Sequence, residues 1–187
     1  MLIRRIRNSS QWADMWSDPI WRTPEDCPPS ALWQLYEARR PDGALSVWRV
    51  TKDEDYENVA AADVLQKGVD AKSELQDLSY VEIAEEYLKV GDYTMVDKPG
   101  NTPLQDVNMK HVDIQSVTGK MFIQFARLVK KHGQLRTITS ARIAARIAQR
   151  LENGDLVPSS FKVSREQVGG LLYALWKSNA VVVRRPS

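Results

Sequence analysis

The sequence predicts an α+β protein, and three observations support this fold class. Short runs rich in β-branched and aromatic residues predict strands, Asp-Gly and proline-rich segments predict turns, and longer stretches with apolar residues three and four positions apart predict helices. The strand-like runs gather in the first part of the chain and the clearest helices in the last part. We therefore expect a small α+β unit with a β-hairpin over residues 1–109, and a mainly helical unit over residues 110–187.

The first sixty-eight residues contain two predicted helices and the hairpin. A short helix is expected at 9–16, and four prolines then make the following segment extended or turning. The runs 32–38 and 44–50 flank a Pro-Asp-Gly turn and predict the β-hairpin. A helix at 53–68 is indicated by acidic residues in its first turn and a Lys-Gly end, with a buried side formed by Tyr56, Val59, Ala60 and Val64.

The middle of the chain alternates short elements. A strand at 80–84, a helical turn through Leu88 and a strand at 93–96 are expected, followed by turn residues at 97–108 that predict the boundary between the two units. A short strand is expected at 111–114.

The last seventy residues predict a regular succession of elements. A helix at 116–132 has an apolar stripe of Phe122, Phe125, Ala126 and Val129 and ends at Gly133. A strand at 134–138 and a helix at 140–152 follow, the latter with Thr139 as its cap and Ile143, Ile147 and Leu151 as its buried side. A third helix opens with a capping box at Ser164 and Gln167, and a closing strand is expected at 180–185.

The order helix, strand, helix, helix, strand over residues 116–185 resembles the winged helix-turn-helix superfamily. "TSARIAARIA" resembles the first helix of such a motif, and "VSREQVGGLLYALWKSNAVVVRR" resembles a recognition helix that runs into a wing strand. The resemblance implies that the second helix lies in the major groove of DNA while the first crosses the backbone. About a dozen residues separate the two helices, whereas three or four are typical of the motif.

The distribution of charge indicates a candidate binding surface. Residues 1–109 carry 12 Lys/Arg and 20 Asp/Glu, a balance of −8, whereas residues 110–187 carry 14 Lys/Arg and 4 Asp/Glu, a balance of +10. A basic segment of this density is an electrostatic candidate for nucleic acid, with DNA favoured over RNA. Contacts to phosphates are expected from nine side chains: Arg136, Arg142, Arg146, Arg150, Arg165, Tyr173, Lys177, Arg184 and Arg185.

Two alternatives to nucleic-acid binding remain open. The acidic part of the chain can neutralise the basic part, so that the row Arg142, Arg146 and Arg150 has its negative partners inside the molecule. The chain can also be an adaptor or inhibitor subunit that docks on another protein. Five of the six tryptophans lie within the first 48 residues, where they form either a core or a protein-binding patch. The pair Gly169-Gly170 within the third helix indicates a close approach, to a phosphate backbone or to a packed helix.

The composition argues against several classes of function. Cys27 is the only cysteine, so an intrachain disulfide is excluded, and only His111 and His132 could add to it in a metal site. No secretory signal or membrane-spanning run is recognised, which favours a cytoplasmic protein. No catalytic motif is visible, so we expect a protein that is not an enzyme and needs no cofactor. An unmarked active site would instead predict a polar cleft lined by His111 or by clustered carboxylates.

Overall fold

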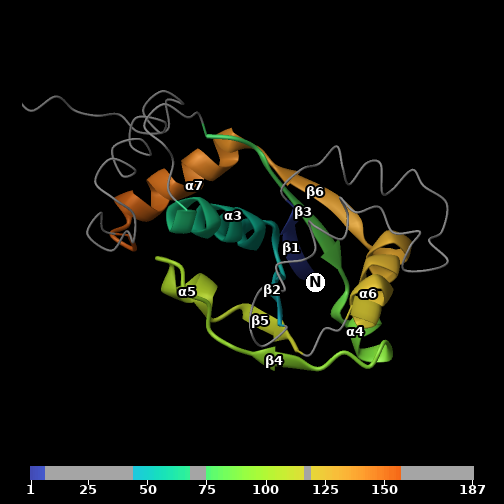
Figure 1. Ribbon diagram of the computed structural model, residues 1–187. Coiled ribbons are helices and arrows are strands. Elements are labelled where there is room, and N and C mark those ends of the chain that lie inside the picture. Colours follow the sequence, from blue (N-terminus) through green and yellow to red (C-terminus); the bar gives the residue numbers. More distant parts are fainter. Residues whose placement is uncertain (7–43, 68–74, 116–118, 157–187) are drawn as a thin grey trace, which may run out of the picture. The chain divides into compact units, whose positions relative to one another are not determined.

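The structure is a computed structural model that describes residues 1–6, 44–67, 75–115 and 119–156 (Figure 1). These residues form strands and helices in alternation. The strands are β1 (Leu2–Ile6), β2 (Leu45–Arg49), β3 (Leu78–Ile83), β4 (Met95–Asp97), β5 (His111–Ile114) and β6 (Gln134–Ile138). The helices are α3 (Asp53–Lys67), α4 (Glu85–Val90), α5 (Gln105–Asn108), α6 (Gly119–His132) and α7 (Ser140–Glu152).

The six described strands form one sheet in the order β4-β5-β2-β1-β3-β6. β1 pairs antiparallel with both β2 and β3, and β5 pairs antiparallel with both β2 and β4. The predicted α+β fold class is therefore confirmed.

β1 occupies the centre of the sheet although the sequence analysis assigned no strand there. Its register is defined by the pairs Leu2 with Ile83 and Leu2 with Arg49. Leu2, Ile3 and Ile6 are at most 3% exposed, and Arg4, at 5%, donates from Nη1 to the carbonyl oxygen of Ser46 at 2.7 Å. The burial of β1 on both of its faces explains why its sequence does not alternate polar and apolar residues. A central strand that is covered on both sides has no face toward solvent.

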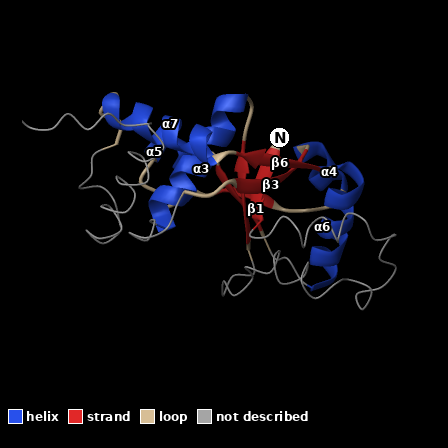
Figure 2. Cartoon of the chain, turned by 90° about the horizontal axis from the view of Figure 1, so that it is seen from above, coloured by secondary structure: helices blue, strands red, loops and turns tan. Residues whose placement is uncertain are grey.

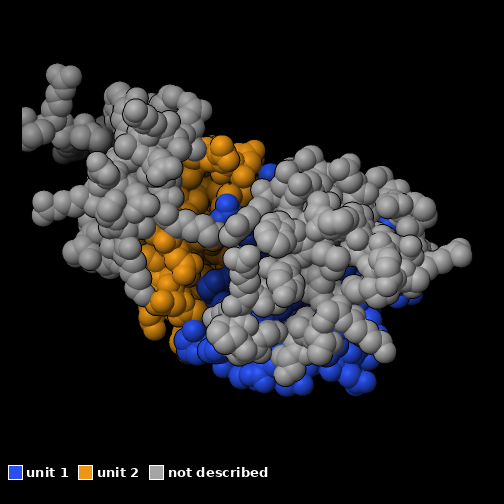
Figure 3. Space-filling view, viewed as in Figure 1, with its two compact units in different colours: residues 1–51, 79–99, 110–137 blue, residues 52–78, 100–109, 138–187 orange. Residues whose placement is uncertain are grey.

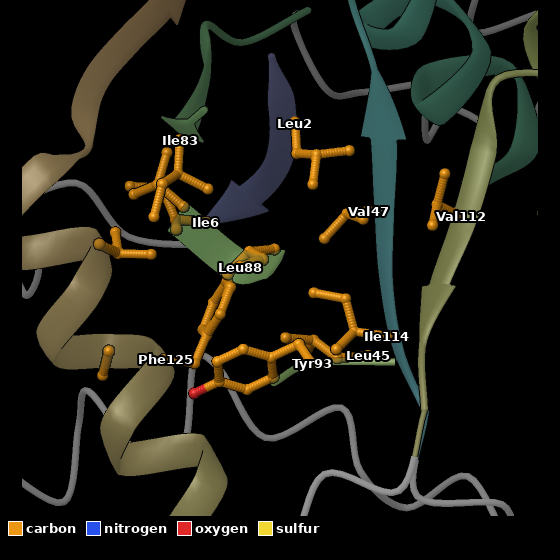
Figure 4. Packing of buried hydrophobic residues seen from close by; sticks show 13 residues of the cluster. Leu2, Ile6, Leu45, Val47, Ile83, Leu88, Tyr93, Val112, Ile114 and Phe125 are labelled. Atoms are coloured by element: carbon orange, nitrogen blue, oxygen red, sulfur yellow. The ribbon is translucent and has the colours of Figure 1, made fainter. Parts of the chain in front are cut away.

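One face of the sheet carries the apolar core of the strands together with α4 and α6. Figure 4 shows these side chains pointing into the space between the strands and α6. Phe125 of α6 is 1% exposed and meets the ring of Tyr93 edge to face at 6.2 Å. α4 and α6 lie next to each other (Figure 2). The cluster comprises Leu2, Ile6, Leu45, Val47, Val81, Ile83, Leu88, Tyr93, Val112, Ile114, Phe125, Ala126 and Val129.

Tyr93 makes this core sensitive to alkaline pH. Its hydroxyl donates to the carbonyl oxygen of Met121 at 2.7 Å, and burial raises the pKa of Tyr93 to about 12 from an ordinary value of 10.0. A group whose pKa is raised by folding stabilises the folded state fully below its unfolded pKa and loses this contribution as pH rises through the folded value. We expect the free energy of unfolding to fall between about pH 10 and 12 for this reason.

The measurement is urea denaturation at pH 7, 10 and 11 for the wild type and Tyr93→Phe. The variant should lose about 1 kcal/mol at pH 7, because the hydrogen bond to Met121 is removed. Its further loss at pH 11 should be smaller than that of the wild type, since the other tyrosines contribute equally to both proteins. Parallel pH dependences would show that Tyr93 does not carry the effect.

The chain divides into two compact units, and each unit is built from three segments that alternate along the sequence with those of the other (Figure 3). One unit consists of residues 1–51, 79–99 and 110–137, and the other of residues 52–78, 100–109 and 138–187. The expected boundary after residue 109, and with it a mainly helical C-terminal unit, is not confirmed. The physical reason is that β5, which follows this boundary, pairs with β2, which precedes it.

Most predicted elements in the described residues are confirmed, with ends that agree or shift by at most three residues. The helix at 53–67, the strands at 78–83, 111–114 and 134–138, and the helix at 140–152 are present. Within the predicted hairpin, the second strand is present as β2, but the first strand and the Pro-Asp-Gly turn lie outside the described residues. The predicted helix at 9–16, the third helix and the closing strand also lie outside them. Across the described ranges, every helix is too short or too polar to cross a membrane.

Candidate functional site

α7 positions the row of arginines that the sequence singled out. The helix begins after Thr139, whose hydroxyl accepts a hydrogen bond from the backbone N–H of Arg142 at 3.4 Å, as a capping residue does. Its buried side consists of Ile143, Ala144, Ile147 and Ala148. Arg142, Arg146 and Arg150 follow one another at intervals of four residues, so their side chains stack along one strip beside the buried side.

α3 is the helix that packs against α7, and both belong to the same unit. Ala60, Ala61 and Ala62 have no exposed surface, and small side chains of this kind allow two helix backbones to approach closely. At the start of α3, the carboxylate of Asp55 accepts a hydrogen bond from the backbone N–H of Lys52 at 3.3 Å, which stabilises the first turn. This packing brings the polar first half of α3 alongside the arginines of α7.

Two carboxylates of α3 hold the first two arginines. The carboxylate of Glu57 contacts both guanidinium groups. Nη2 of Arg142 and Nη2 of Arg146 each lie 2.7 Å from one of its oxygens. Nη1 of Arg146 in addition lies 3.0 Å from a carboxylate oxygen of Glu54 and 2.7 Å from the amide oxygen of Gln149. Arg146 is thus bound by three side chains, and Glu57 bridges two guanidinium groups.

Arg150 is held by a second set of acceptors. Its Nη2 donates to Asn58 of α3 at 2.9 Å and to Asp106 of α5 at 2.6 Å, and its Nη1 lies 3.4 Å from Asp155. Asp106 follows a loop that is fixed by the buried pair Thr102 and Asn108, joined by three hydrogen bonds of 2.7 to 2.9 Å. The loop therefore supplies a rigid base for the carboxylate that reaches Arg150.

The three arginine side chains of α7 differ in burial, and burial decides how much each ion pair contributes to the free energy of unfolding. The side chains of Arg146 and Arg150 are 13% and 14% exposed, whereas that of Arg142 is 47% exposed. Ion pairs at exposed positions contribute at most about 1 kcal/mol, whereas breaking a buried pair leaves an uncompensated charge and costs about 3–5 kcal/mol. Arg146 and Arg150 consequently have the larger structural role.

Of the two glutamates that contact Arg146, Glu54 has the more exposed side chain, at 43% against 18% for Glu57. Its hydrogen bond with Lys52 and the nearby charge of Arg146 lower the pKa of Glu54 below the ordinary value of 4.5. Glu54 therefore faces Arg146 as an anion at neutral pH.

Arg136 lies in the other unit and is also paired. Its Nε lies 3.2 Å from a carboxylate oxygen of Glu82, and the side chain of Glu82 is only 7% exposed. The other five predicted contacts, Arg165, Tyr173, Lys177, Arg184 and Arg185, lie outside the described residues. Each of the four predicted arginines that the structure describes is therefore paired with a carboxylate, and their contact with nucleic acid stays a prediction.

A second polar cluster surrounds Asp113 on β5. Its carboxylate lies 3.3 Å from Nζ of Lys98, 3.4 Å from Oγ of Ser46 and 3.7 Å from Nε2 of His111. Nδ1 of His111 lies 2.7 Å from the carbonyl oxygen of Lys98, and Trp48 packs edge to face on the imidazole ring at 4.7 Å. His111 is 6% exposed and Asp113 1%, whereas the side chain of Lys98 is 51% exposed, so the cluster is buried at His111 and Asp113 and reaches solvent at Lys98.

Within the described ranges, no group of three His, Cys, Asp or Glu side chains is arranged to hold a metal ion. No family model matches the chain, and neither a curated protein nor a solved structure matches it. The winged-helix resemblance remains a prediction, because its third helix and its wing strand lie outside the described residues.

Sequence reasoning identified the arginines but not their partners. The partners lie 44 to 92 residues away in the chain, and the sequence marks them only as ordinary polar positions: Glu54, Glu57, Asn58 and Asp106. One signal could have indicated the pairing. Glu54, Glu57 and Asn58 are three and four residues apart and therefore share one side of a helix, in the same way as the arginines.

Proposed function

We propose that this chain is a non-enzymatic protein-interaction module, such as an adaptor or inhibitor subunit, and that it does not bind nucleic acid directly. The observation that carries the proposal is the pairing of the arginine row of α7 with Glu54, Glu57 and Asp106. A guanidinium that is 13% exposed and already holds carboxylates would have to break these contacts before it could reach a phosphate.

The energetic balance supports this proposal over nucleic-acid binding. Phosphate contacts gain affinity mainly by releasing counterions from the nucleic acid. A cation that must first leave an internal carboxylate exposes that carboxylate to the approaching phosphates, and the repulsion between the two anions opposes binding. The four described arginines therefore supply little of the electrostatic attraction that their number in the sequence suggests.

The test is a fluorescence-anisotropy titration of the full chain with labelled duplex DNA, single-stranded DNA and RNA. Non-specific binders reach dissociation constants of about 10⁻⁴ to 10⁻⁶ M at physiological salt, and affinity increases steeply as salt is lowered. We expect no saturable binding at 50 mM salt with protein up to ~100 µM. The exposed Arg142 provides the matched variant, because Arg142→Glu should fold and would weaken any binding through this strip.

Saturable binding that weakens with rising salt, by about 0.9 log units per log salt for each phosphate contacted on a duplex, would overturn the proposal in favour of nucleic-acid binding. Loss of that binding in Arg142→Glu would place the contact on α7. Absence of binding to all three probes supports the proposal.

A further inference from the structure

We draw no further inference here: the strongest candidate, the basic patch of Arg127 and Lys131 on α6, in which Nε and Nη2 of Arg127 are buried with no hydrogen-bond partner among the residues that the structure describes, carries none, because nothing in the described part of the chain shows which anion would reach this guanidinium.

Discussion

Replacement of Arg146 by alanine is expected to lower the free energy of unfolding by about 3 kcal/mol, because it leaves Glu57 largely buried with one exposed cation as its partner. Arg146 is 13% exposed and contacts Glu54, Glu57 and Gln149. Arg142→Ala is the matched control on the same helix and against the same glutamate. Its side chain is 47% exposed, so its loss should cost less than about 1 kcal/mol. Urea denaturation of both variants at neutral pH measures the difference.

A double variant separates the loss of the ion pair from the loss of packing. Replacing both members of a largely buried ion pair by apolar residues of similar size removes the charges together, and this is often neutral for stability. Arg146→Met combined with Glu57→Leu should therefore be more stable than Arg146→Ala. Equal and small losses for Arg146→Ala and Arg142→Ala would show that the pairing between α3 and α7 contributes little, and the argument against nucleic-acid binding would lose its basis.

Replacement of Gly133 by alanine is expected to cost about 3 kcal/mol, because a Cβ atom at this position has no room. It would lie 2.5 Å from the carbonyl oxygen of Val129 and 2.8 Å from that of Glu82. Both are backbone atoms, so no side chain can rotate away to relieve the contact. The chain must therefore move at the junction between α6 and β6, where Gly133 also donates to Val129 at 2.7 Å.

Gly154, after the end of α7, is the control for this prediction. It has a φ of 75°, and a Cβ atom would meet nothing within 4 Å. Gly154→Ala should therefore cost only the conformational strain of a left-handed residue, about 1–2 kcal/mol. Thermal and urea unfolding of the two variants test the contrast. A Gly133→Ala protein as stable as Gly154→Ala would contradict the prediction, because it would show that the backbone around Gly133 moves away from the added Cβ atom at little cost.

The sequence predicted Gly133 as a helix-ending residue, but for a different reason. A glycine after a helix usually adopts a left-handed conformation. Gly133 does not have a positive φ of this kind, and the close approach of β3 requires the glycine instead. The position was therefore predictable from local pattern, whereas its cause depends on a strand about fifty residues earlier in the chain.

Elements with a strong local pattern were predicted most accurately. α7 has a capping threonine and an apolar stripe of Ile143 and Ile147, and the structure confirms both. β1 carries no such signal, because Leu2 and Ile3 are both buried and two arginines follow them. The candidate site shows the same limit of local pattern. Spacing alone placed Arg142, Arg146 and Arg150 on one side of a helix, but spacing cannot reveal what faces that side.

The sequence by itself determined the fold class, most helices and strands of the described residues, and the concentration of positive charge after residue 109. These properties follow from periodicity, capping and composition, which are local. Only the tertiary structure decided that β1 is central, that each compact unit combines three separate segments of the chain, and that Glu54, Glu57 and Asp106 meet the arginines of α7. Charges neutralise one another across space rather than along the chain, so a count of basic residues gives no measure of the positive charge that remains at the surface.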